Sequence, residues 1–190
     1  MDTQERALQL LNSDAVTKRF QILNLQWAES PLDSYYRDAN GPLDFLLNGL
    51  HSCNSFSWKA DDLSRANQPD TVLMEHKRSL DASNLMRSSF MEEIDATVVG
   101  LFTLRPQAEL DGFDVNSETV GQIIDRLSVL SLKRHNVLEQ LTASNAEEAE
   151  ARIEAQRHYV SHCLDQFLQS LASGTAHMLA YKQFKTYRGS

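Results

Sequence analysis

Apolar residues recur along this chain at the spacing of one helix face, and prolines separate the periodic segments. Within residues 14–29, Val16, Phe20, Leu23 and Trp27 follow one another at steps of four, three and four. Steps of three and four keep side chains on one side of a helix. No segment shows the sustained alternation of apolar and polar residues that a half-buried strand requires. The pattern therefore predicts an all-α fold.

Two prolines predict where long helices begin. Pro42 follows the turn-forming pair Asn40-Gly41, and Pro69 follows a polar stretch. Proline suits the first helical position because its missing N–H would have no partner there. We therefore expect one helix over 42–67 and a second from residue 69 to about residue 100, with a loop after it.

The C-terminal half carries signals for two further helices. Asn116 or Ser117 can cap the first of them, and Ser144 with Glu147 has the capping-box spacing for the second. The first of the two has an apolar seam typical of antiparallel bundles, which fits packing within one chain and packing between two copies of a homodimer equally well. The seam consists of Ile123, Leu127, Leu130, Val137 and Leu141.

These elements predict an up-and-down bundle of four long helices plus an N-terminal helix. We expect a single helical-bundle domain over 1–190, with the N-terminal helix and loop in 1–41 and the core bundle in 42–188. Gly174 either ends or bends the last helix.

Composition narrows the function only a little. The chain has 190 residues and a formal net charge of −8. A negative balance disfavours non-specific nucleic-acid binding and attachment to anionic membranes, because both need a positive field. No apolar run reaches the length of a membrane span. Cys53 and Cys163 are too few for a disulfide scaffold, and two free thiols fit a cytoplasmic protein.

Polar rows on the second and third predicted helices are the unusual feature of the chain. His51, Asn54, Trp58, Asp61 and Arg65 follow one another at steps of three and four, so they share one helix face. The next helix has a similar row of Lys77, Asp81, Asn84, Ser88 and Asp95, flanked by Arg78 and Arg87.

Two interpretations of these rows are open. They could form a solvated stripe held by pairs four residues apart, such as Lys77–Asp81. Alternatively, both rows turn inward, meet around Trp58 and form a buried polar network. A large aromatic in the row favours the second interpretation. Because buried charges are costly unless paired, such a network would serve binding or chemistry more than stability.

Several segments resemble a known bacterial family. Residues 50–65 carry Leu-His, Asn, Trp, an acidic pair and Arg, and residues 77–87 with 93–95 resemble a second signature. Residues 124–133 and 181–185 resemble a third signature and the family's tail. The family is known as a domain of unknown function, number forty-two fifty-four. The resemblance implies an all-helical cytoplasmic protein whose genes often neighbour glycosyltransferases of the heptosyltransferase type.

Our first hypothesis is a binding or accessory protein in bacterial envelope glycan synthesis. Its ligand would be an anionic small molecule, such as a nucleotide-sugar, or its partner a glycosyltransferase, with arginines making bidentate contacts. The candidate ligand-binding residues are His51, Asn54, Trp58, Asp61, Asp62, Arg65, Lys77, Arg78, Asp81, Asn84, Arg87, Asp95, Asp125 and Arg126.

Two enzymatic alternatives remain open. In a nucleotide pyrophosphohydrolase-like enzyme, carboxylates on adjacent helices would hold Mg²⁺ as the cofactor. In a HEPN-type ribonuclease (higher eukaryote and prokaryote nucleotide-binding), Arg157 and His162 would act on RNA, with His158 after the arginine. The metal ligands under the first alternative would be Asp61, Asp62, Glu92 and Asp95.

Overall fold

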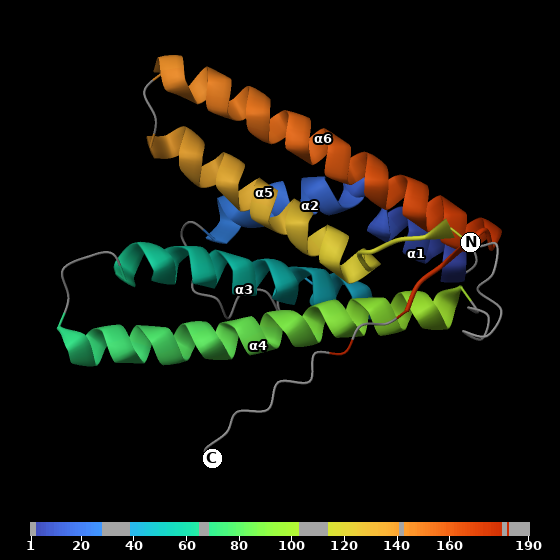
Figure 1. Ribbon diagram of the computed structural model, residues 1–190, viewed down its shortest axis with the longest axis horizontal. Helices are drawn as coiled ribbons and strands as arrows, with labels where there is room; N and C mark the ends of the chain where they lie inside the picture. Colours follow the sequence, from blue (N-terminus) through green and yellow to red (C-terminus); the bar gives the residue numbers. More distant parts are fainter. Residues whose placement is uncertain are drawn as a thin grey trace.

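The computed structural model describes residues 3–27, 39–64, 69–102, 114–140, 143–179 and 182. Within these ranges, helices dominate and the predicted all-α class is confirmed (Figure 1). The helices are α1 (Thr3–Leu11), α2 (Ser13–Trp27), α3 (Pro42–Ser64), α4 (Asp70–Leu101), α5 (Val120–Gln140) and α6 (Ala143–Ser173). None of the helices in the described ranges has a stretch both long and apolar enough to cross a lipid bilayer.

One short pairing of strands joins distant parts of the chain. Strand β1 (Asp114–Val115) precedes α5, and β2 (Ala176–His177) follows α6. The two strands run parallel, with Asp114 opposite Ala176 and Val115 opposite His177. This pairing brings the segment after α6 to the start of α5.

The N-terminal segment forms two helices where the sequence predicted one. Asn12 interrupts the run, and its side-chain oxygen accepts a hydrogen bond from the Ala15 N–H at 2.9 Å. This is the geometry of an N-cap, so α2 begins as a new helix after Asn12. The predicted segment 14–29 corresponds to α2, whereas α1 was missed.

The long helices pack as two pairs. Helix α3 lies beside α4, α5 lies beside α6, and α2 lies behind α5 (Figure 1). In the figure, each of the four long helices runs opposite to the one before it. Fully buried apolar side chains come from α1 to α6 and form one continuous core. The largest of them include Leu11, Phe20, Leu47, Leu50, Ile94, Ile124, Leu127 and Leu164.

The first turn of α5 is held by its own capping box and by residues from two other segments. The predicted caps, Asn116 and Ser117, are wrong: Thr119 and Gln122 form a reciprocal capping box instead, with bonds of 2.8 and 3.3 Å. The Gly121 N–H donates to the Asp95 carboxylate of α4 at 2.7 Å. The Val120 N–H donates to the Met178 sulfur at 3.3 Å.

A glycine lets α5 approach α4 closely at this point. A Cβ on Gly121 would lie 2.6 Å from the Met91 carbonyl oxygen and 3.0 Å from an Asp95 oxygen. Such distances leave no room for a side chain, so α4 and α5 touch backbone to backbone. The contact fixes where the following turns of α5 lie against α3 and α4.

Helix α6 begins one residue before the predicted cap and ends at a glycine. It starts at Ala143, whereas the capping box was expected at Ser144. Gly174 has a φ of 71°. The Gly174 N–H donates to Leu171 and the Thr175 N–H to Ser170, which is the Schellman arrangement. Gly174 therefore ends the helix, which leaves the chain free to turn back toward α5.

Candidate functional site

A continuous chain of polar side chains runs through the middle of the bundle. Its centre is His51 of α3, which is 0% exposed. The His51 Nδ1 lies 2.8 Å from the Ser128 hydroxyl of α5, and its Nε2 lies 2.8 Å from the Asn24 Oδ1 of α2. Phe20 stacks on the imidazole with ring centroids 4.5 Å apart. His51 therefore joins three helices within the core.

The hydrogen bonds on either side of His51 determine which of its ring nitrogens carries the proton. The Asn24 amide nitrogen donates to both the carbonyl and the hydroxyl of Ser131. Its oxygen therefore faces His51, so Nε2 carries the proton and Nδ1 accepts from Ser128. The Ser128 oxygen in turn accepts from the Asn54 amide at 2.9 Å. Each donor in this part of the network meets an acceptor.

The other end of the chain is an ion pair. The Asn54 amide also donates to Asp125 Oδ1 at 2.8 Å. Arg87 of α4 donates its Nε–H to the same oxygen at 2.7 Å and a terminal N–H to Asp125 Oδ2. Asp125 is buried, whereas the Arg87 side chain is 31% exposed. We call the seven residues of this chain the buried network: Asn24, His51, Asn54, Arg87, Asp125, Ser128 and Ser131.

Burial sets the protonation of the network. Removal from water lowers the pKa of His51 to about 3, with a smaller contribution from His135. The imidazole is therefore neutral at pH 7. The hydrogen bonds to Asp125 raise the pKa of Arg87, so its guanidinium stays charged. A neutral hydrogen-bonded interior thus ends in a charged pair near the surface.

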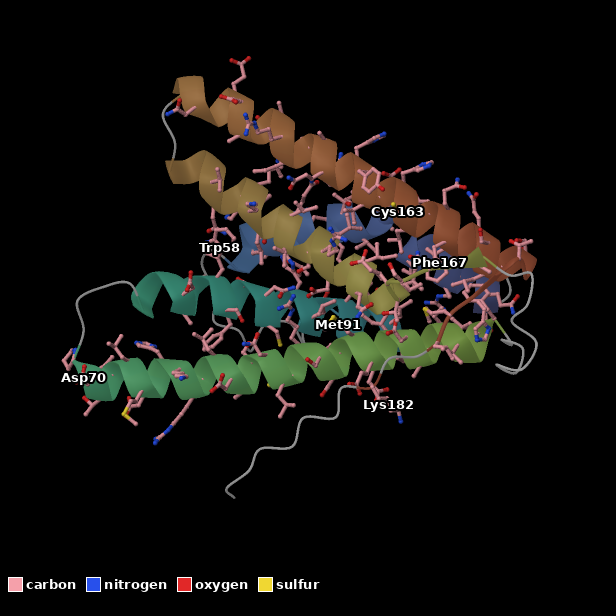
Figure 2. All side chains as sticks on the ribbon, viewed as in Figure 1. Trp58, Asp70, Met91, Cys163, Phe167 and Lys182 are labelled. Carbon is pink, nitrogen blue, oxygen red and sulfur yellow. The ribbon has the colours of Figure 1, made fainter. Side chains whose placement is uncertain are left out.

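The predicted polar rows turn inward only in part. Burial confirms this for His51, Asn54 and Asp95, and Trp58, Asn84 and Arg87 are half-buried. The predicted inward orientation is wrong for the outer ends of the rows, which are exposed. There α4 extends toward Asp70, beyond the part of the helix that α5 covers (Figure 2). The exposed members, which we call the exposed rows, are Asp61, Lys77, Arg78 and Asp81.

Two of the predicted candidates cannot be placed. Arg65 and the side chain of Asp62 lie outside the described residues. Arg126 is placed and is exposed: its guanidinium donates to both oxygens of Glu118 at 2.7 and 2.9 Å. The expected meeting of polar residues therefore involves Asn54, Arg87 and Asp125, not Asp61 and Asp81.

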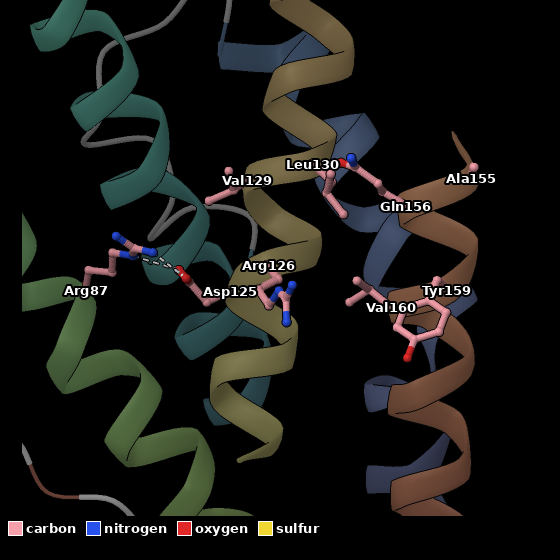
Figure 3. A pocket seen from close by; sticks show the side chains of 9 residues that line it. All are labelled: Arg87, Asp125, Arg126, Val129, Leu130, Ala155, Gln156, Tyr159 and Val160. Carbon is pink, nitrogen blue, oxygen red and sulfur yellow. Dashed lines mark hydrogen bonds and ion pairs between the residues drawn. The ribbon is translucent and has the colours of Figure 1, made fainter. Parts of the chain in front are cut away.

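A cavity of about 590 Å³ opens beside the ion pair (Figure 3). Arg87 and Asp125 lie at one side of it, Arg126 lies nearby on α5, and α6 supplies Gln156 and Tyr159 opposite. We call it the Arg87 cavity. Its remaining lining residues are Val129, Leu130, Ala155 and Val160. The cavity therefore combines a charged side with an apolar wall.

A second cavity of about 540 Å³ lies between α2, α5 and α6. Asn24 and Ser131, the far end of the buried network, are among its lining residues. We call it the Arg157 cavity. Its other lining residues are Thr17, Gln21, Leu25, Arg134, His135, Glu154 and Arg157. The network thus connects two cavities on different faces of α5.

The structure separates Asp61 of the metal alternative from Asp95 and Glu92, which are neighbours on α4. Asp61 is exposed at one end of α3, whereas Asp95 is buried and accepts the Gly121 N–H at the start of α5. Glu92 is half-buried. The described part of the chain contains no cluster of three side chains suited to a metal ion.

The residues of the ribonuclease alternative have different surroundings. Arg157 donates to Glu154 at 2.7 Å and lines the Arg157 cavity. His158 and His162 are exposed on α6. The guanidinium of Arg157 is therefore already held by an acidic neighbour.

Both cysteines are free, as predicted, but only one is buried. Burial raises the pKa of Cys53 to about 11, so its thiol is protonated at neutral pH. Cys163 is half-buried on α6.

The sequence reasoning missed Asn24, Ser128, Ser131 and Tyr159. Ser128 and Ser131 stand four and seven residues after Ile124, in a row next to the apolar seam of α5. Small polar residues beside an apolar seam are a usable signal for a buried network. Tyr159 carries no such signal, because a single tyrosine on a charged helix is common.

The geometry defines a class: an all-α helical bundle with a hydrogen-bonded polar interior and a cavity at each end of it. Residues 45–179 match the family described as Protein of unknown function (DUF4254), which is more than two thirds of the chain. The chain belongs to this family, and the resemblance of its motifs is thereby confirmed. No curated protein and no solved structure matched it.

Proposed function

We propose that this protein binds an anionic small molecule in the Arg87 cavity. The observation that carries the proposal is the Arg87–Asp125 pair at the side of a cavity large enough for a small molecule. Binding cavities for small molecules typically have volumes of roughly 300–1,000 Å³.

The network supports the proposal by orienting Arg87 in advance. Asp125 is held by Asn54, which is held in turn through Ser128 and His51. A guanidinium fixed in this way loses little freedom when it binds an anion. Arg87 uses two donor groups on Asp125, and a guanidinium has others with which to bind phosphate or carboxylate.

Charge and shape indicate the kind of ligand. Among the lining residues, Arg87 and Arg126 are positive and Asp125 is negative, so the lining carries a net charge of +1. The wall of α5 and α6 is largely apolar, and Tyr159 offers an aromatic ring. A ligand with an anionic group and a flat or apolar part matches both sides of the cavity.

Nucleotide-sugars have this combination of features. Together with the family resemblance, this supports a binding or accessory role in the cytoplasmic steps of bacterial envelope glycan synthesis. A glycosyltransferase would then be the protein partner that consumes the bound molecule.

The test is a titration of the protein with a panel of nucleotide-sugars, in which isothermal calorimetry measures binding. Arg126→Gln removes one positive charge from an exposed position, so the fold should be unaffected. We expect at least one ligand to bind, and Arg126→Gln to weaken its binding by about tenfold, as loss of a charge-assisted contact predicts.

Arg152→Gln is the matched control. Arg152 is a more exposed arginine on α6, paired with Glu148 and absent from the lining of the cavity. It should bind like the wild type. The proposal fails if no nucleotide-sugar binds, or if the two arginine variants lose affinity equally.

A further inference from the structure

The Arg157 cavity is a second concave site, independent of the Arg87 cavity. Its lining residues on α5 are Ser131, Arg134 and His135, whereas those of the Arg87 cavity are Asp125, Arg126, Val129 and Leu130. At about 100° per residue these two sets lie on different faces of α5. A ligand in one cavity therefore does not fill the other.

Two arginines in this cavity are held in position by the same acid. Arg157 donates its Nε–H to Glu154 Oε2 at 2.7 Å. Arg134 Nε lies 3.1 Å from Glu154 Oε1, and a terminal nitrogen of Arg134 donates to Glu150. Glu154 thus lies between the two guanidinium groups and restricts both.

Two donors in the cavity wall make no hydrogen bond of good geometry in the described part of the chain. The hydroxyl of Thr17 is buried, on a residue that is only 7% exposed, and makes no hydrogen bond there. The Nε of Arg134 is buried and close to Glu154, yet it also makes no hydrogen bond. Buried donors are rarely left without a partner. An oxygen-rich acceptor within the cavity would satisfy the Thr17 hydroxyl and would share the Arg134 Nε–H with Glu154.

We propose that the Arg157 cavity binds a small molecule through a carboxylate or phosphate group. The group would accept hydrogen bonds from the Thr17 hydroxyl and the Arg134 Nε–H, and Arg157 would supply a second positive charge. Oxyanions suit this set because guanidinium groups and hydroxyls donate to them together. Arg134, Arg157 and Glu154 together give the lining a charge of +1, counted without His135.

The buried network offers a local signal of binding. Asn24 lines the cavity, and its Oδ1 accepts the His51 Nε2–H at 2.8 Å. Any change in the position of Asn24 therefore alters the hydrogen bond at His51. Because His51 is fully buried, its imidazole nitrogens make no direct contact with an ion that binds on the outer surface.

The experiment is a nuclear magnetic resonance titration of the whole chain, labelled with ¹⁵N-histidine. Inorganic phosphate and succinate are added in separate arms, so that the two oxyanion types are distinguished. We expect saturable shifts of the His51 Nε2 resonance in at least one arm. We also expect Thr17→Val to weaken that binding by about tenfold, since it removes one donor without changing size.

Matched controls separate this site from other effects. Thr97→Val removes a hydroxyl of α4 that bonds only to Glu93 in the described residues, and it should leave binding unchanged. Arg157→Gln should weaken binding, whereas Arg152→Gln on the same helix should not. Circular dichroism shows that each variant is folded.

Several outcomes would overturn the proposal. One is the absence of saturable shifts in both arms, which would mean that water fills the cavity. Another is equal binding by Thr17→Val and the wild type. A third is a binding loss caused by Arg126→Gln, which would assign the anion to the Arg87 cavity and leave the proposed function untouched.

Discussion

The buried network and the exposed rows begin from the same sequence pattern and have different surroundings. The members of the buried network on α3 and α4 are His51, Asn54 and Arg87, and they stand in or beside the same polar rows as the exposed residues. Asn54 and Arg87 lie where α5 covers the α3–α4 pair, and their partner Asp125 comes from α5. Asp61, Lys77 and Asp81 lie beyond that cover and are exposed. A third helix, not the pattern itself, decides whether a polar row is buried.

Losing a hydrogen-bond or ion-pair partner should cost more free energy in the buried network than in the exposed rows. A polar group in the interior must be hydrogen-bonded, and losing its partner costs roughly 1–3 kcal/mol, or more for a charge. An exposed pair contributes about 0–1 kcal/mol, because water replaces the partner. The two regions should therefore respond very differently to the same substitution.

Replacing an aspartate in each region gives the largest contrast. Asp125→Ala leaves Arg87 and Asn54 without their shared acceptor, and we expect it to lower the free energy of unfolding by roughly 3 kcal/mol. Asp81→Ala, on the exposed side of α4, should change it by less than about 0.5 kcal/mol. Urea denaturation of both variants measures the difference. Equal losses would mean that the ion pair is not structurally important.

Acid should destabilise the protein through His51 of the buried network. The pKa of His51 is about 3 in the folded chain and 6.5 in the unfolded chain. Between these values only the unfolded chain binds a proton at this site, so stability falls as the pH falls from 6.5 toward 3. This one group contributes about 1.4 kcal/mol per pH unit at most, and above pH 6.5 its contribution is constant.

Histidine resonances test this pH dependence directly. The His51 signals should not move between pH 7 and pH 4. In denaturation experiments, His51→Gln should reduce the loss of stability below pH 6.5, and His158→Gln should not. A midpoint near 6.5 for His51 would contradict its burial in a neutral network.

A smaller effect is expected where α5 meets α4. Gly121→Ala places a methyl group 2.6 Å from the Met91 carbonyl oxygen, so the helices must separate. Overpacking of this kind costs roughly 1–3 kcal/mol. Gly100→Ala is the control. No atom lies within 4 Å of the Cβ that the alanine would add, so the substitution should stabilise α4 slightly. Thermal unfolding measures the melting temperature of both variants. A Gly121→Ala variant as stable as the wild type would show that α5 does not need this contact.

The sequence was sufficient to locate the long helices. Pro42 opens α3 and Pro69 immediately precedes α4, as their fixed φ predicts. Helix α1 was not predicted, because Asn12 interrupts the periodicity and also caps α2. Element type follows from local rules, whereas breaks within a helical region depend on a single side chain.

The site was less predictable than the fold. His51, Asn54, Arg87 and Asp125 were all singled out from the sequence, but Asp61 and Asp81 were expected beside them. Spacing assigns a residue to a face of its own helix, and it does not say how far the neighbouring helix extends. Only the tertiary arrangement shows that α5 covers one half of the rows.

The sulfur contact at the start of α5 has a consequence for synthesis on the ribosome. Val120 donates to Met178, and β1 pairs with β2, so the first turn of α5 is completed by residues made almost sixty positions later. A nascent chain that ends before Ala176 contains α1 to α6 yet lacks these partners. The native start of α5 is therefore completed only when residues 176–178 emerge from the exit tunnel.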